Sequence, residues 1–196
     1  MEIRRSNYYI RPLRYEDGLL LKKWEKFTSP LFEGYNFNNM DGKTLRRWYI
    51  TKQRFYRSSY FSILSNEDEL IGYIGIKEIN RFLKRAKLGI VLNAKMVSKG
   101  IGTAALSDFL EYYFNEINMQ KLTLEVNDWN HRAKRLYEKL GFKYENTRYE
   151  YCKNQSININ RKEYEDVRDS FEKRPNGLYT KIHQMSLTRQ EYLNET

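Results

Sequence analysis

Two glycines stand beside a lysine in Lys99-Gly100-Ile101-Gly102, between a short apolar run and a run with helical spacing. The apolar residues 88–92 predict a strand, and residues 104–110 predict the start of a helix. Backbone N–H groups and the positive end of the helix dipole therefore converge on this turn, an arrangement that suits a phosphate. Because glycine has no Cβ, a ligand can approach the backbone closely, and Lys99 adds a cation.

A Gly-x-Gly pair alone also fits an ordinary turn. The turn lacks the Gly-Lys-Ser/Thr of a nucleoside triphosphate loop and the third glycine of a dinucleotide fold. A second and more specific stretch lies further along the chain. It reads Asn130-x-x-Ala133-x-x-Leu136-Tyr137-Glu138-Lys139-Leu140-Gly141-Phe142.

Together these stretches resemble two motifs of the GNAT superfamily of acyl-CoA N-acyltransferases. Residues 97–102 resemble its pyrophosphate loop, Arg/Gln-x-x-Gly-x-Gly/Ala, and residues 130–142 match its second motif almost residue for residue. The resemblance covers residues 8–151 and resumes at 179–187. The layout is most similar to the branch that includes ribosomal-protein and spermidine N-acetyltransferases. The chain departs from the pattern at Val97, where the family has Arg or Gln, and at Ser98, where glycine is common.

The resemblance implies an α+β fold in αβα layers. Its mixed, mostly antiparallel central sheet has about six to seven strands, is splayed in the middle and is flanked by helices. We expect a single N-acetyltransferase domain over residues 1–196, with an insertion at about 154–177 before the last strand.

Local patterns predict the individual elements. We expect Asp17 and Asp41 to cap the first two helices and Gly141 to end a later one. Strands are predicted near 8–13, 60–64, 70–76, 85–92, 121–126, 142–152 and 178–187. Helices are predicted at 17–27, from 42 through Phe55, at 104–117, at 130–140, and within the insertion, where Tyr164, Val167 and Phe171 share a face.

The resemblance also implies acetyl-CoA as the cofactor and assigns residues to it. The thioester and pantetheine would lie along Ile90, Val91 and Leu92. The pyrophosphate would be held by Val97, Ser98, Lys99, Gly100, Ile101, Gly102 and Thr103. Asn130, Ala133 and Tyr137 would contact the cofactor from the second motif, although Asn130 is also a good helix N-cap.

By the same resemblance, Tyr137 is the candidate general acid near the cofactor sulfur. A phenol, with an ordinary pKa near 10, stays protonated at neutral pH and can donate to a departing thiolate. Helical spacing alone makes Tyr137 a core residue. Relatives carry a glutamate base in Ala-Glu-x-Gly, which here reads Ala86-Lys87-Leu88-Gly89. Glu78 is the candidate substitute, and a chain of waters is the alternative.

The predicted function is transfer of an acetyl group from acetyl-CoA, by direct attack, to a primary amine of a small molecule or of a protein or peptide N-terminus. One alternative, which Val97 and Lys87 favour, is a catalytically weak binding module for an anionic partner. Another is a transferase acting on aminoacyl-tRNA or a ribosomal protein. The acceptor's identity depends on residues 28–57 and 154–176, which the sequence leaves uninterpreted.

Composition limits the remaining classes. The 35 Lys and Arg against 25 Asp and Glu give a net charge of +10. That charge suits an anionic cofactor or association with RNA or the ribosome, and argues against a polycationic acceptor. The lone Cys152 excludes an internal disulfide, and His131 and His183 offer no metal-binding spacing. No apolar run is long enough for a membrane span and no secretory signal is evident, so we expect a cytoplasmic enzyme, with the inserted helix as a potential homodimer contact.

Overall fold

The computed structural model describes residues 2–53 and 57–195, so Phe55 of the predicted second helix lies outside the described residues. These residues form two compact units, one ending at Gln120 and one beginning at Lys121. The expectation of one domain over the whole chain stays a prediction.

The first unit contains an antiparallel sheet in which each strand pairs with the next along the chain. Its five strands are β1 (Ile3–Arg4), β2 (Tyr9–Pro12), β3 (Ser58–Leu64), β4 (Leu70–Asn80) and β5 (Arg85–Leu92). The four longer strands confirm those expected from alternation and apolar runs. Strand β1 has only two residues and leaves no periodic signal.

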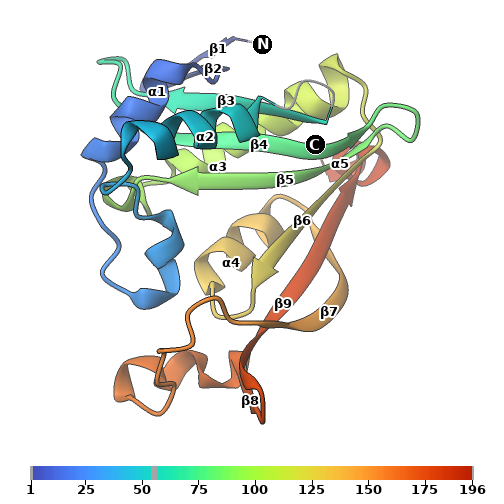
Figure 1. Cartoon of the computed structure of the whole chain (residues 1–196). Helices are drawn as coiled ribbons and strands as arrows, with labels where there is room; N and C mark the ends of the chain where they lie inside the picture. The colour runs from blue at the N-terminus through green and yellow to red at the C-terminus, as the bar shows by residue number, and fades with distance from the viewer. Residues whose placement is uncertain (1, 54–56, 196) are drawn as a thin grey trace. The chain divides into compact units, whose positions relative to one another are not determined.

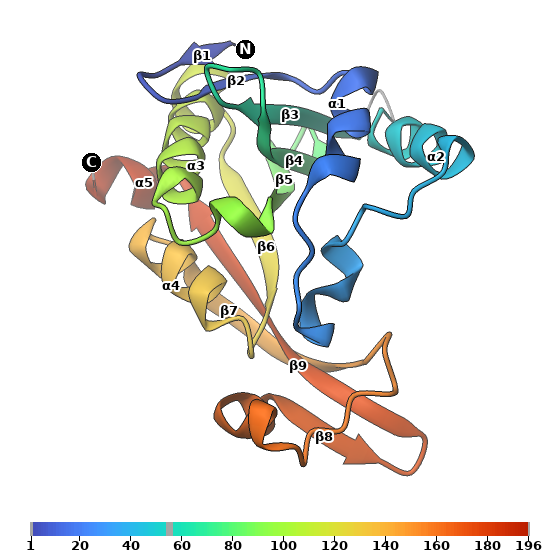
Figure 2. The same ribbon diagram turned by 90° about the vertical axis from the view of Figure 1, so that its left-hand side faces the viewer.

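Helices cover both faces of this sheet. The helices α1 (Tyr15–Leu20) and α2 (Gly42–Lys52) lie on one face, and α3 (Ile101–Glu111) lies on the other (Figures 1 and 2). Ring contacts agree: Trp48 packs against Tyr73 on the α2 side, and Phe61 packs against Phe109 on the α3 side. Short helical turns complete the unit: η1 (Leu21–Lys23), η2 (Pro30–Tyr35), η3 (Ala94–Met96) and the π-helical turn η4 (Tyr112–Glu116).

Asp41 caps α2 as expected, since its Oδ1 accepts the N–H of Thr44 at 2.7 Å. Asp17 takes part in capping α1, but not as the N-cap, which is Arg14: it is the third helical residue of a capping box, and its Oδ2 accepts the Arg14 N–H at 2.8 Å. The helix α1 with η1 ends at Lys23, earlier than expected. The Asp17 carboxylate is buried and accepts bonds from both terminal nitrogens of Arg11 and from the Ser62 hydroxyl. This carboxylate therefore ties α1 to β2 and β3, a tertiary role that local capping rules do not reveal.

The second unit contains an antiparallel sheet with β9 (Gly177–Thr188) at its centre. Strands β6 (Lys121–Asn127) and β7 (Lys143–Tyr151) flank β9, and the short β8 (Phe171–Arg174) pairs with its N-terminal end. The helix α4 (His131–Lys139) packs on this sheet (Figure 1), and α5 (Arg189–Glu195) follows β9.

The insertion differs from the expected amphipathic helix. A 3-10 helix, η5 (Lys162–Ser170), contains Tyr164, but Phe171 begins β8 and lies opposite Thr180. Pro175 and Asn176 form the two-residue turn of this hairpin, and Gly177 has a φ of 139°. The hairpin partner therefore draws Phe171 into a strand, against its helical spacing in the sequence.

The α+β class and the mostly antiparallel sheet flanked by helices are confirmed. Nine strands are present among the described residues, more than expected, because β1 is very short and β8 lies inside the insertion. The expected splaying in the middle of the sheet stays a prediction. No helix in the described part of the chain is both long and apolar enough to cross a membrane.

Candidate active site

The segment that links β5 to α3 has two residues in the left-handed backbone region. Gly100 is the N-cap of α3 with a φ of 79°, and Ser98 has a φ of 65°. The left-handed region is costly for a residue with a Cβ, so Ser98 carries local strain. This conformation explains in physical terms why glycine suits the Ser98 position.

The start of α3 presents a row of backbone N–H donors. The N–H groups of Thr103 and Ala104 both donate to the Gly100 carbonyl at 3.1 Å. Within the described residues, no acceptor pairs with the backbone N–H groups of residues 99–102. Because no side chain caps α3 either, the positive end of its dipole is left for a ligand. The arrangement is suited to an anion such as a diphosphate.

The end of β5 is held in place by a close approach to β4. Gly72 lies opposite Leu92, and a Cβ on Gly72 would stand 2.6 Å from both the Leu92 side chain and the Val91 carbonyl oxygen. The N–H of Asn93 then donates to the Ile71 carbonyl at 2.8 Å. The half-buried Ile90, Val91 and Leu92 thus enter the glycine turn from a fixed strand end.

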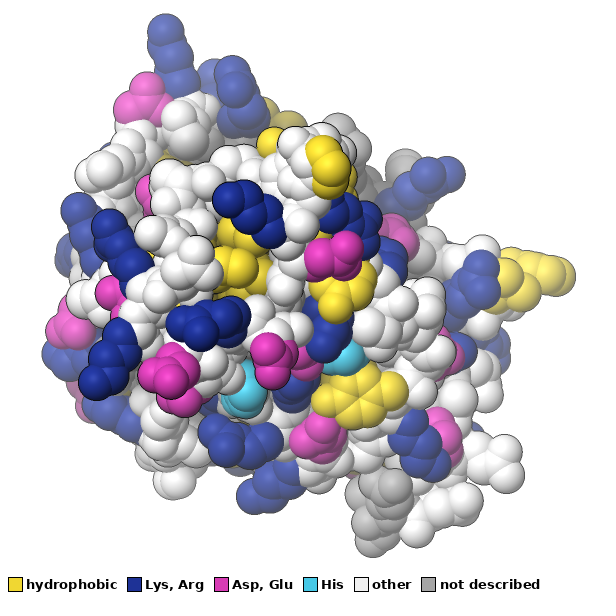
Figure 3. Space-filling view, turned by 90° about the horizontal axis from the view of Figure 1, so that it is seen from below, with side chains coloured by type: hydrophobic (Ala, Val, Ile, Leu, Met, Phe, Trp, Pro, Cys, Tyr) yellow, Lys and Arg dark blue, Asp and Glu magenta, His cyan; other side chains and the backbone are white. Residues whose placement is uncertain are grey.

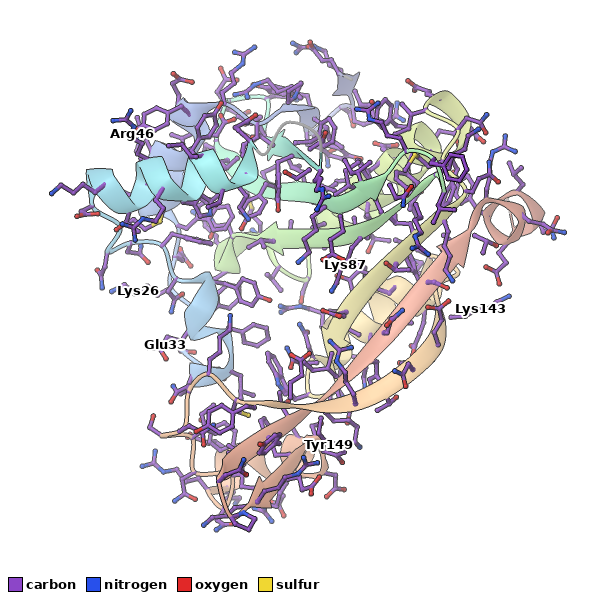
Figure 4. All side chains as sticks on the ribbon, turned by 45° about the vertical axis from the view of Figure 1, so that its right-hand side comes forward. Lys26, Glu33, Arg46, Lys87, Lys143 and Tyr149 are labelled. Atoms are coloured by element: carbon purple, nitrogen blue, oxygen red, sulfur yellow. The ribbon has the colours of Figure 1, made fainter. Side chains whose placement is uncertain are left out.

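Glu78 lies near the other end of the β4–β5 hairpin. Its φ is 56°, its side chain is largely exposed, and its Oε1 lies 4.0 Å from Nζ of Lys87. Lys87 projects from β5 at the position that resembles the family glutamate (Figure 4). The structure therefore places a carboxylate beside the position where Lys87 replaces one.

The second motif forms α4 as expected. The Oδ1 of Asn130 accepts the N–H of Ala133 at 3.2 Å, which confirms the N-cap, and Gly141 follows the helix with a φ of 84°. The Asn130 NH₂ group has no acceptor among the described residues and keeps both donors for a ligand. Tyr137 is buried, and its ring meets that of Phe142 edge-on at a centroid distance of 5.8 Å.

The predicted site residues thus fall into two groups. Ile90, Val91, Leu92 and residues 97–103 lie in the first unit, separated by η3, with Glu78 on the neighbouring strand β4. Asn130, Ala133 and Tyr137 share α4 in the second unit. Each group has the local structure that the motif predicts.

A polar cluster centred on Asp128 was not anticipated. Asp128 Oδ1 accepts from Nε2 of His183 at 2.8 Å and also binds the Lys134 ammonium, while Oδ2 accepts from the Ser170 hydroxyl at 2.8 Å. The other ring nitrogen of His183 lies 2.8 Å from the Thr147 hydroxyl. Asp128 thereby joins the start of the second motif to α4, to β9 and to the end of η5.

Burial alone would raise the pKa of Asp128. The hydrogen bonds from Lys134, His183 and Ser170 outweigh it and hold the pKa of this carboxyl well below its ordinary value. The sequence carried one signal for the cluster, which is an acid immediately after a predicted strand and before the motif. Its partners, however, are distant in the chain.

Two further observations bear on chemistry. Cys152 is buried, and burial raises the pKa of its thiol to about 11, so it is not a nucleophile at neutral pH. No group of three or more His, Cys, Asp or Glu side chains is arranged to hold a metal in the part of the chain that the structure describes.

Basic side chains are interspersed with acidic ones on the face that Figure 3 shows. Among the described residues of that face, Lys and Arg do not gather into a single block. Acidic side chains therefore separate the basic ones on this face, which does not present the continuous basic groove that favours nucleic acid.

Comparisons with known proteins identify the family of the chain. The family model described as an acetyltransferase (GNAT) domain matches residues 8–143. The chain is 32% identical over 83 residues to spermidine N(1)-acetyltransferase of Escherichia coli, which is 42% of this chain and 45% of the relative. It is 30% identical over 82 residues to the Vibrio cholerae enzyme of the same name, covering 42% and 47%. The matches thus span about half the length of these curated relatives.

Solved structures show the same fold. A chimera of the spermidine N-acetyltransferase SpeG from Vibrio cholerae and hSSAT aligns with a TM-score of 0.71 at 22% identity, covering 96% of this chain and 99% of the chimera. The Vibrio cholerae SpeG structure with manganese ions aligns with a TM-score of 0.67 at 23% identity, covering 97% and 98%. With the motif geometry and the family match together, the chain belongs to the acetyltransferase (GNAT) family.

Proposed function

We propose that the protein is an acetyl-CoA-dependent N-acetyltransferase that moves an acetyl group to a primary amine. The observation that carries the proposal is the row of backbone N–H groups at residues 99–102, at the start of α3, which have no acceptor among residues 2–53 and 57–195. Such donors suit the pyrophosphate of coenzyme A. Ser98 and Thr103 border the row, and Lys99 within it adds a cation. Val97 supplies no charged contact where the family has Arg or Gln.

The thioester is proposed to lie along Ile90–Leu92, where backbone groups would pair with pantetheine. Holding the acetyl carbon at the fixed end of β5 turns a bimolecular reaction into an oriented one, which alone lowers the barrier substantially. Backbone N–H groups near the thioester oxygen would stabilise the oxyanion as it develops.

In this proposal Tyr137 protonates the departing thiolate. Its ring is fixed by burial and by Phe142, so the hydroxyl has a restricted set of positions, as a general acid requires. Glu78 is proposed as the base that takes the amine proton, directly or through water, because its carboxylate stands beside Lys87. Asn130 and Ala133 are proposed to contact the cofactor from the start of α4.

The relatives' names make spermidine the first acceptor to test. The net charge of +10 disfavours a polycation, so the panel should include monoamines and peptides with a free N-terminus. Transfer to aminoacyl-tRNA or a ribosomal protein, a homodimer contact through the insertion, and RNA association stay predictions.

Thermal melting with ligands tests the cofactor. Acetyl-CoA at a hundred-fold excess over its Kd should stabilise the chain by about 2.7 kcal/mol. Pantetheine, which lacks the pyrophosphate, should bind far more weakly if the N–H row makes the contact. Equal shifts from coenzyme A and pantetheine would contradict the assigned anion site.

Turnover is then measured as thiol release with the amine panel. Release that depends on an amine supports the transferase. If acetyl-CoA stabilises the protein and no amine yields free thiol, the proposal gives way to the weak binding module.

A further inference from the structure

An aromatic cage surrounds one lysine ammonium in the first unit. Nζ of Lys52 lies 4.5 Å from the ring centroid of Tyr60, 5.3 Å from that of Tyr73 and 5.5 Å from that of Trp48. The rings also contact one another: Tyr73 meets Trp48 edge-on at a centroid distance of 5.7 Å, and its ring is tilted against that of Tyr60 at 6.3 Å. Lys52 thus sits where aromatic faces attract a cation.

The positions of β3, β4 and α2 bring the rings and the lysine of this cage together. Tyr60 lies opposite Gly75 in the β3–β4 ladder, and a Cβ on Gly75 would stand 2.2 Å from the Tyr60 ring. Glycine therefore lets the ring lie flat over β4. Lys52 is the last residue of α2, which brings its side chain over the same face of the sheet.

The Lys52 amine has a lower pKa than an ordinary lysine. Burial and the positive charge of Lys77 lower its pKa to about 8, although the three rings favour the charged form. No carboxylate among the described residues forms an ion pair with it. A large share of the amine is therefore unprotonated at mildly alkaline pH, which is the form that attacks a carbonyl.

The cage also lies next to the proposed thioester. Tyr73 pairs directly with Val91 across β4 and β5, and neighbouring strands are about 4.8 Å apart. Val91, like Trp48 and Tyr60, packs against the hydrophobic core cluster that contains Tyr73. The flexible four-carbon stem of Lys52 gives its amine reach toward that strand end.

We propose that Lys52 is a self-acetylation site, modified by acetyl-CoA bound to the same chain. The inference rests on the proposed function for the supply of acetyl-CoA. Nζ of Lys52 attacks the thioester carbonyl carbon, a C–N bond forms, and the C–S bond breaks. Coenzyme A leaves with one proton as the thiol, and the amide of acetyl-lysine remains. The modified side chain no longer carries the charge that the rings attract.

The test incubates the full chain with saturating acetyl-CoA at pH 8 and follows acetylation by intact mass and peptide mapping. We expect one acetyl group, on Lys52, at a rate per molecule that does not change on dilution of the protein. Excess coenzyme A should slow it. The rate should rise as pH approaches 8 and level above it. Lys52→Arg should abolish this modification and keep the stabilisation by acetyl-CoA, while Lys77→Arg should leave it intact.

Three results would overturn the inference. Acetylation of Lys77 or other lysines as fast as Lys52 indicates reaction from solution. A rate proportional to protein concentration indicates transfer between molecules. If the protein acetylates added amines while Lys52 stays unmodified, self-acetylation is excluded and the proposed function still stands. If acetyl-CoA does not raise the melting temperature, the proposed function itself is contradicted.

Discussion

Nε2 of His183 donates a hydrogen bond to Oδ1 of Asp128 at 2.8 Å, so a residue of β9 is fixed to the loop that opens the second motif. Because an ionised carboxylate only accepts, the proton of this bond belongs to the histidine. The same Asp128 binds the Lys134 ammonium on α4 and the Ser170 hydroxyl at the end of η5. One carboxylate therefore orders three segments of the second unit.

Replacing Asp128 by Asn should destabilise the protein by about 2 kcal/mol at pH 7, because a charged acceptor is lost from a mostly buried cluster. The pKa of Asp128 in the folded protein lies below its ordinary value near 4. Its stabilisation is thus complete above pH 4 and is lost as pH falls through the folded pKa. Urea unfolding should show a smaller difference between the two proteins at pH 3 than at pH 7. The exposed Asp166→Asn is the control, and equal midpoints at pH 7 would rule out this role.

Ser98→Gly should raise the free energy of unfolding by up to about 1 kcal/mol. Glycine removes the cost of a Cβ at positive φ, which is about 1–2 kcal/mol, but gains freedom in the unfolded chain. Ser98→Ala keeps the strain and should bring no gain. Chemical denaturation of the three proteins measures this, and a gain from alanine equal to that from glycine would show that the backbone is not strained.

Gly72→Ala should weaken acetyl-CoA binding and destabilise the fold by about 1–3 kcal/mol, because the new methyl meets the Val91 carbonyl oxygen and Leu92 at 2.6 Å. The strand end must then shift. Gly89→Ala is the matched control, since its Cβ meets nothing within 4 Å. Titration calorimetry measures the affinity of both variants for acetyl-CoA. Equal affinities would show that the position of this strand end does not affect cofactor binding.

Tyr137→Phe should lower kcat by about 10²–10⁴-fold, since phenylalanine keeps the ring against Phe142 and removes only the hydroxyl. The stabilisation by acetyl-CoA should not change. Steady-state thiol release with the best acceptor measures the effect. Full activity in the variant would assign protonation of the thiolate to another group.

The β5–turn–α3 segment shows what local pattern can predict. An apolar run, a glycine at positive φ and helical spacing occur within a few residues, and β5 spans the predicted residues 85–92. Asn130 and Gly141 likewise fulfil their capping roles because caps depend on neighbouring backbone alone.

Contacts between distant residues account for the rest. Asp17 was assigned to a local cap and also binds Arg11 and Ser62, and Phe171 begins a strand that pairs with β9 in place of the helix that its spacing predicts. The Asp128 cluster and the cage around Lys52 both join elements separated by a long stretch of chain. A short stretch of sequence does not specify which distant residue will contact it in the fold.

The buried Cys152 has a practical consequence for the assays. It is the single cysteine of the chain, and its thiol stays protonated and shielded in the folded protein. A disulfide reagent that reports free coenzyme A will therefore meet little background from the enzyme itself. The same reagent, added alone during heating, reports through its reaction with Cys152 when this part of the second unit opens.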